Sequence, residues 1–188
     1  MAGGKKFDLT KSSIVEASAN ALWPVVADVP RWAPWFRAAR GQAGLEKVEE
    51  LPYQAGALAA DTPELGKLFR FTFTNGFRAT FQLHYWMQPS QVSLRMLPET
   101  REQAHGIEGF ILDFDLFPRP DGTTQVWFGA TVMMERGVHP GVLARWPKRE
   151  IMGWVEGFHA RLVREGPTLA GGAVTKKEVA ALRGAGGK

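Results

Sequence analysis

Two aspartates separated by one residue, Asp113 and Asp115, form a pair that could serve as a general acid and base. In a β-strand, Asp113 and Asp115 would point to the same face about 7 Å apart, a separation that a general acid–base pair can use. The apolar residues of the same segment, Phe110, Leu112 and Leu116, occupy the alternating positions and would point inward. We therefore predict that both carboxylates are ordinary outward-facing residues.

Glu108 is the acidic residue closest to an inward position, because it shares the alternation of Phe110. It would lie at the entrance end of that strand, where a buried acid could move protons. A surface carboxylate at the end of a strand is the favoured interpretation. Tyr85 supplies the single hydroxyl group expected on the inner face.

Metal and nucleophile sites have little support in the sequence. Of the four histidines, only His159 has a carboxylate, Glu156, at the helical spacing that puts two ligands on one face, and one such pair does not hold a metal firmly. We expect His159 to be a helix-surface residue beside Phe158. The chain has no cysteine, and it lacks a Gly-x-Ser-x-Gly elbow, a phosphate loop, a dinucleotide fingerprint and a His-Glu-x-x-His helix. We predict no catalytic residue, no metal and no cofactor.

The elements that would position these residues are mostly β-strands. From residue 66 to residue 135, apolar residues alternate with polar ones in successive runs, as is typical of antiparallel strands with one buried face. Asn75-Gly76 and Pro120-Asp121-Gly122 are typical of hairpin turns, so the strands should form a meander. The inward set would comprise Phe69, Phe71, Phe73, Phe81, Leu83, Tyr85, Val92, Leu94, Met96, Phe110, Leu112, Phe114, Leu116, Val126, Phe128, Ala130, Val132 and Met134.

One long amphipathic helix, at about 139–165, is the natural cover for this face, because Ile151, Phe158 and Leu162 recur at helical spacing. We expect its main part to start near Pro147 and to stop at Gly166-Pro167.

The N-terminal part predicts a strand at 12–17, short helices at 19–27 and 30–39, and a further strand at 48–53, with Ser18 as the N-cap of the first helix. The predicted fold class is therefore α+β: β-α-α, then about six antiparallel strands, then a long C-terminal helix.

This order of elements resembles a known superfamily. The segment Ile14-Val15-Glu16-Ala17-Ser18, followed by Leu22-Trp23 and by Asp-Val-Pro-Arg-Trp-Ala-Pro-Trp at 28–35, resembles the opening of START-related helix-grip (SRPBCC) proteins. Residues 109–134 and 140–164 are similar to their closing hairpin and gripping helix. The resemblance covers most of residues 8–165 and is nearest to the branch of polyketide cyclases and ubiquinone-binding chaperones. It implies a curved sheet wrapped around the last helix, with a cavity open near the short helices.

Composition agrees with a single domain at 8–165 followed by a Gly/Ala-rich flexible tail at 166–188. A chain of 188 residues that is 45% hydrophobic can bury about 70% of its unfolded surface. The net charge of +4 is scattered along the chain, which does not favour a nucleic-acid partner. Basic residues on the last helix leave open a transient contact with an anionic membrane surface. With no signal-like or membrane-spanning apolar run, we expect a cytoplasmic protein.

We predict that the inner face and the last helix line a site for a hydrophobic small molecule, such as a lipid, isoprenoid quinone, sterol or polyketide-like aromatic. Three residues, Trp32, Trp35 and Phe36, would gate it. A pocket and a simply filled core remain alternatives. The lining would comprise Phe71, Phe81, Leu83, Tyr85, Leu94, Met96, Phe110, Leu112, Phe128, Val132, Trp154 and Phe158.

Two other functions stay open. One is a polyketide cyclase, aromatase or dehydratase in which Tyr85, Glu108, His105 or Arg37 moves protons. The other is a ligand-sensing interaction module that uses the basic last helix or the tail. Whether the protein is an enzyme is therefore left undecided, and a non-enzymatic binder is favoured because the inner face carries almost no titratable group.

Overall fold

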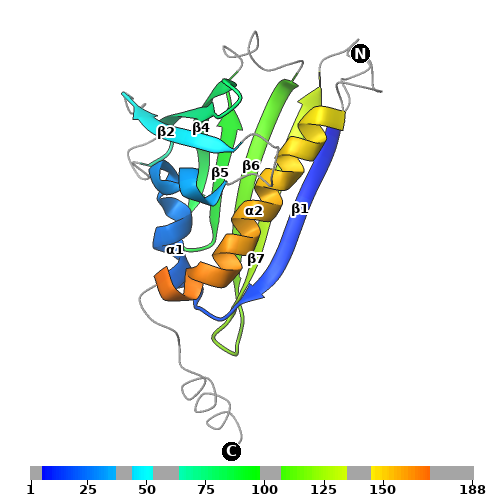
Figure 1. The fold of residues 1–188 in the computed structure, drawn as a ribbon. Coiled ribbons are helices and arrows are strands. Elements are labelled where there is room, and N and C mark those ends of the chain that lie inside the picture. Colours follow the sequence, from blue (N-terminus) through cyan, green and yellow to red (C-terminus); the bar gives the residue numbers. More distant parts are fainter. Residues whose placement is uncertain (1–5, 37–43, 53–63, 98–106, 135–144, 170–188) are drawn as a thin grey trace, which may run out of the picture.

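The structure, a computed structural model, describes residues 6–36, 44–52, 64–97, 107–134 and 145–169. Seven antiparallel strands form one sheet, and α1 and α2 lie on the same face of it (Figure 1). The elements are β1 (Lys6–Val15), α1 (Ala19–Ala27), the 3-10 turns η1 (Val29–Arg31) and η2 (Ala33–Trp35), β2 (Leu45–Leu51), β3 (Leu68–Phe73), β4 (Arg78–Met87), β5 (Gln91–Met96), β6 (Ile107–Pro118), β7 (Thr124–Met134) and α2 (Arg145–Leu169). The predicted α+β class is confirmed.

The strand order is β1-β7-β6-β5-β4-β3-β2, so strands β2 to β7 form the predicted meander and β1 pairs with β7. Side-chain hydrogen bonds within the turns stabilise the two predicted hairpins. Between β3 and β4, the side chain of Asn75 accepts a hydrogen bond from the Phe77 backbone N–H at 3.0 Å, and Gly76 has a φ of 83°. Between β6 and β7, Asp121 accepts one from the backbone N–H of Thr123 at 3.1 Å.

Helix α1 begins at the predicted cap, because the Ser18 hydroxyl accepts from the backbone N–H of Ala21 at 3.3 Å. The predicted helix at 30–39 is wrong in its described part, which forms η1 and η2. Pro30 and Pro34 lack the backbone N–H that a continuous α-helix needs, so the chain makes two short turns here instead. Residues 37–43 lie outside the described residues.

Helix α2 lies obliquely across the sheet, from the β1 side to α1 (Figure 1). Its residues Ile151, Val155, Phe158 and Leu162 are each no more than 1% exposed. No helix in the described ranges is long and apolar enough to cross a membrane.

The expected stop of α2 at Gly166-Pro167 is wrong, because the helix continues to Leu169. An ideal Cβ on Gly166 would lie 3.0 Å from Cδ2 of Leu22, so the bare backbone lets this end of α2 approach α1 closely. Helix α2 therefore runs past the expected domain boundary at residue 165, and residues 170–188 of the expected tail lie outside the described residues.

Candidate functional site

The inner face of the sheet is apolar, as the alternation predicts. Eleven of the twelve predicted lining residues are no more than 4% exposed, and their part in ligand binding stays a prediction. These eleven are Phe71, Phe81, Leu83, Leu94, Met96, Phe110, Leu112, Phe128, Val132, Trp154 and Phe158.

The inward orientation predicted for Tyr85 is wrong. The pairing of β4 with β5 shifts register between Leu83 and Tyr85, and this irregularity reverses the faces of the residues that follow. Tyr85 is 43% exposed, whereas Trp86 packs on the core and meets Trp23 edge to face, with 4.8 Å between ring centroids. The inner face therefore loses its predicted hydroxyl and gains an indole.

Near α1 the interior is filled by aromatic rings. Phe114 and Phe128 stack with their centroids 4.0 Å apart, and Phe158 of α2 lies 4.7 Å and 5.1 Å from them. Trp32 lies 4.6 Å from Phe114, and Phe36 lies 5.0 Å from Phe158. Phe114 is buried on the inner face, as the alternation of β6 predicted.

All three predicted gate residues belong to this aromatic cluster, since Trp35 also lies 5.3 Å from Phe158, and Trp32 and Phe36 are at most 1% exposed. The Trp32 indole N–H donates to the carbonyl of Val26 at 3.1 Å, which fixes η1 and η2 against the end of α1. The third, Trp35, is 8% exposed and lies under the Arg161 guanidinium. A gating role for the three stays a prediction.

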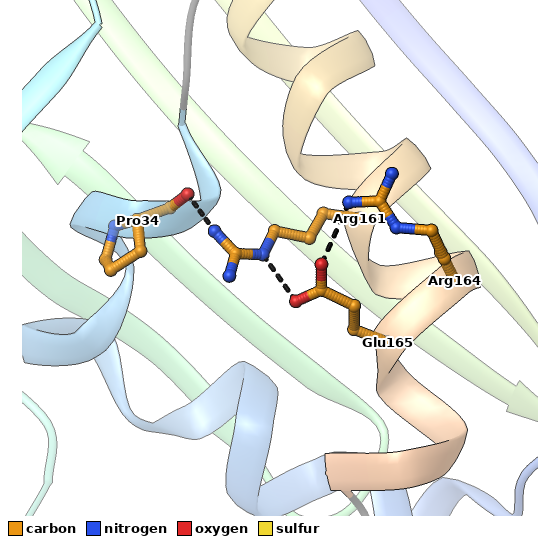
Figure 2. A network of polar contacts seen from close by, with 4 residues as sticks. All are labelled: Pro34, Arg161, Arg164 and Glu165. Atoms are coloured by element: carbon orange, nitrogen blue, oxygen red, sulfur yellow. Dashed lines mark hydrogen bonds and ion pairs between the residues drawn. The ribbon is translucent and has the colours of Figure 1, made fainter.

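Arg161 of α2 connects the helix to the turn η2, which carries Trp35 (Figure 2). It donates one hydrogen bond to the carbonyl oxygen of Pro34 and another, 2.6 Å long, to the Glu165 carboxylate. Arg164 donates to the other oxygen of the same carboxylate at 2.9 Å. The carbon at the centre of the Arg161 guanidinium lies 5.4 Å from the Trp35 ring centroid, so Arg161 also makes a cation–π contact there. The pKa of Glu165 is held below its usual value by these hydrogen bonds.

A second group of described rings lies in the other half of the interior, near the start of α2, where Phe71 also packs on Phe81 at 4.6 Å. Phe73 of β3 stacks on Trp154 of α2 at 4.3 Å, while Phe110 lies 6.5 Å from Trp154 and 5.5 Å from Phe81. Smaller or more flexible buried side chains lie beside these rings, since Ala79 pairs with Phe71 and Met96 pairs with Phe81.

Buried polar side chains are scarce among the described residues: Ser93, Thr124 and His159. Ser93 donates a hydrogen bond to Asp113 on the outer face, and Thr124 donates one to the carbonyl of Ala17 at 2.7 Å. His159 is only 8% exposed and Nε2 has no hydrogen-bond partner within the described part, so its predicted place on the helix surface is wrong. Burial, and to a smaller extent Lys11, lowers the pKa of His159.

The two described candidate proton carriers, Tyr85 and Glu108, do not lie on the inner face. Glu108 is exposed because the β6–β7 register shifts between Ile107 and Gly109. Asp113 and Asp115 face outward as predicted, though half-buried, while His105 and Arg37 lie outside the described residues. Within the described ranges, no group of three His, Cys, Asp or Glu side chains could hold a metal ion.

Comparison with known proteins connects this geometry to a fold. No family model matches the chain, and no curated protein sequence matches it significantly. Among solved structures, the Zhui aromatase/cyclase from Streptomyces sp. R1128 has a TM-score of 0.57 at 18% identity, covering 89% of this chain and 99% of that one. TTHA0849 from Thermus thermophilus has a TM-score of 0.60 at 12% identity, covering 85% and 97%.

A third similar structure is a norcoclaurine synthase point mutant from Thalictrum flavum in complex with a transition state analogue. It has a TM-score of 0.52 at 13% identity and covers 80% of this chain and 94% of that one. At these identities the similarity concerns the fold, and it agrees with the resemblance found in the sequence. The chain therefore has a helix-grip fold like that of START-related (SRPBCC, Bet v 1-like) proteins.

Proposed function

We propose that the protein binds and carries a hydrophobic small molecule between the sheet and α2. The observation that carries this proposal is the inner face itself, which is apolar from β3 to β7 and is faced by Trp154 and Phe158 of α2. Such a surface suits a ligand with a large apolar body, such as a lipid, an isoprenoid quinone, a sterol or a polyketide-like aromatic.

The half of the interior near the start of α2 is the better place for the ligand. Close ring contacts fill the half near α1, where Phe114 and Phe128 are stacked. Near Trp154, by contrast, Ala79 contributes only a methyl group and Met96 has a flexible side chain that can adapt to a bound molecule.

Similar structures support a small-molecule function. One is an aromatase/cyclase, and the norcoclaurine synthase structure holds a transition state analogue. Catalysis of either kind needs a titratable group beside the substrate. Tyr85 and Glu108 both face solvent here, and His159 is the one titratable side chain that is buried among the described residues, so we favour binding over catalysis.

A pair of added-bulk variants tests the proposal. Ala79→Leu adds volume in the half assigned to the ligand, and Val92→Phe adds volume beside Phe114 in the filled half. We expect Ala79→Leu to lower uptake of dansyl-undecanoic acid, an apolar fluorescent probe, while changing stability by less than about 1 kcal/mol. Val92→Phe should cost about 1–3 kcal/mol through overpacking. A comparable cost for both variants, with unchanged probe uptake, would show a filled core and refute the proposal.

A further inference from the structure

The face of the sheet turned away from the helices exposes large apolar side chains. Ile14, Phe117 and Trp127 are 51%, 49% and 45% exposed. Ile14 and Phe117 pair with Gln125 from opposite sides, and the rings of Phe117 and Trp127 meet edge to face at 6.2 Å. These three residues form one strip across β6, β7 and β1, which we call the outer apolar strip.

A hollow of about 310 Å³ adjoins this strip. Gly129 of β7 pairs with Thr10 on one side and Asp113 on the other, so a side chain is missing between these two neighbours. Trp127 and Asp115 form a wall of the hollow in the next row of the sheet, and Asp8 also lines it.

Charge in the hollow is negative, although the whole chain carries +4. Asp113 and Asp115 lie about 7 Å apart on the same side of β6. In the described part of the chain neither makes an ion pair, while Asp8 has Lys6 at 3.4 Å. Burial, together with the charge of Asp113, raises the pKa of Asp115, as expected for a carboxylate that lacks a cation.

We propose that this outer face docks a basic segment of a partner protein, with an arginine side chain in the hollow and an apolar side chain on the outer apolar strip. A guanidinium is planar, so it can stack on the exposed indole of Trp127 while it donates paired hydrogen bonds to a carboxylate such as Asp115. The space left by Gly129 lies in the row of Asp113, and Phe117 lies four residues from Asp113 along β6, about 13 Å at the rise of a strand. An extended segment with an arginine and a leucine four positions apart matches both features.

The probe is an acetylated and amidated Arg-Ser-Thr-Ser-Leu peptide, compared with the same peptide carrying citrulline, the neutral analogue of arginine. Indole N–H signals in ¹⁵N NMR spectra report binding, and Trp127→Phe assigns the signal of Trp127. We expect the arginine peptide to shift this signal and the amide of Gly129, with affinity about tenfold weaker for the citrulline peptide.

Two variants, with a third as their control, test whether the peptide binds in the hollow. Gly129→Val fills it, and its Cβ would lie 3.2 Å from Cγ2 of Thr10, an exposed side chain that can move. Asp115→Asn removes one charge, and Glu46→Gln removes a matched exposed charge on β2, at the far edge of the sheet. The first two should weaken binding several-fold and the third should not.

Equal binding of the two peptides, no binding, or an equal loss in Glu46→Gln would overturn the proposal. A concentration-dependent dimer abolished by Trp127→Ser would assign the face to a second copy of the chain. If deletion of residues 170–188 shifts the Trp127 signal, the outer face is bound by the chain's own C-terminal segment. Either of these results would also overturn the proposal.

Discussion

The indole of Trp154 on α2 stacks on the ring of Phe73 on β3, with 4.3 Å between their centroids and 20° between their planes. On the other side of the helix, Glu156 pairs with Lys11 of β1 at 3.2 Å. Helix α2 is thus fastened to strands near both edges of the sheet, and the apolar inner face lies between these two contacts.

The stacked pair should contribute strongly to stability. We predict that Trp154→Ala lowers the free energy of unfolding by about 3–5 kcal/mol, because it removes a buried indole and leaves a cavity. Trp154→Phe keeps a ring on Phe73 and should cost clearly less. Urea unfolding measures both variants, and a cost below about 1 kcal/mol for Trp154→Ala would show that the contact does not hold the helix.

Residues after the β4 irregularity should respond according to the faces that the structure gives them. Tyr85→Ala should change the free energy of unfolding by less than about 0.5 kcal/mol, since this side chain is exposed. Trp86→Ala should cost several times more, because it removes the edge-to-face contact with Trp23. Thermal unfolding of the two variants shows which of the two side chains is buried. A larger loss of stability for Tyr85→Ala than for Trp86→Ala would contradict the faces that the structure gives these residues.

The buried His159 should make stability depend on pH. Because its pKa is lowered in the folded protein from the usual 6.5, the unfolded chain takes up a proton at a higher pH than the folded protein. The resulting stability is present above about pH 6.5 and is lost as the pH falls below it. We predict that His159→Leu flattens the fall in unfolding free energy between about pH 7 and pH 5.

The exposed His84 provides the matched control for this measurement. Stability curves of His84→Leu and wild type should run parallel across the same pH range. If His159→Leu runs parallel to them as well, the buried imidazole is not the source of the slope.

Arg161 should couple α2 to the turns that carry Trp32 and Trp35. We predict that Arg161→Lys lowers the free energy of unfolding by about 1–2 kcal/mol, because an ammonium group cannot reproduce both forked hydrogen bonds and the contact with Trp35. Hydrogen exchange should speed up at the backbone N–H groups of Trp32 and Trp35. Arg164→Lys, which alters only the outer contact to Glu165, is the control, and equal effects of the two variants would argue against this coupling.

Alternation along the strands predicted the sheet and its buried face, since the pleat converts every second residue into a neighbour on one side. It failed where the β4–β5 register shifts after Leu83, because the irregular pairing reverses the faces of the later residues of β4 while the sequence shows just two adjacent aromatics, Tyr85 and Trp86. Glu108 shares the alternation of Phe110 but is exposed, as the favoured interpretation expected. The pair Tyr85-Trp86 breaks the alternation, and this break was the one indication of the irregularity in the sequence.

Contacts between distant segments decided the remaining differences. His159 is buried because α2 packs against β1, which begins at Lys6, well before the strand predicted at 12–17. Helix α2 continues past Gly166 to Leu169, and the missing side chain at Gly166 leaves room for Leu22 of α1. Such packing is not encoded in local propensity.

The central claim, that the interior takes up a hydrophobic ligand, is tested most directly by native mass spectrometry. The full chain is expressed with added lipid extract, purified, weighed intact, and then extracted with organic solvent. We predict a stoichiometric apolar adduct of a few hundred daltons that is recovered chemically unchanged and is reduced in Ala79→Leu. A folded protein that shows no adduct in the presence of the lipid extract would contradict the claim.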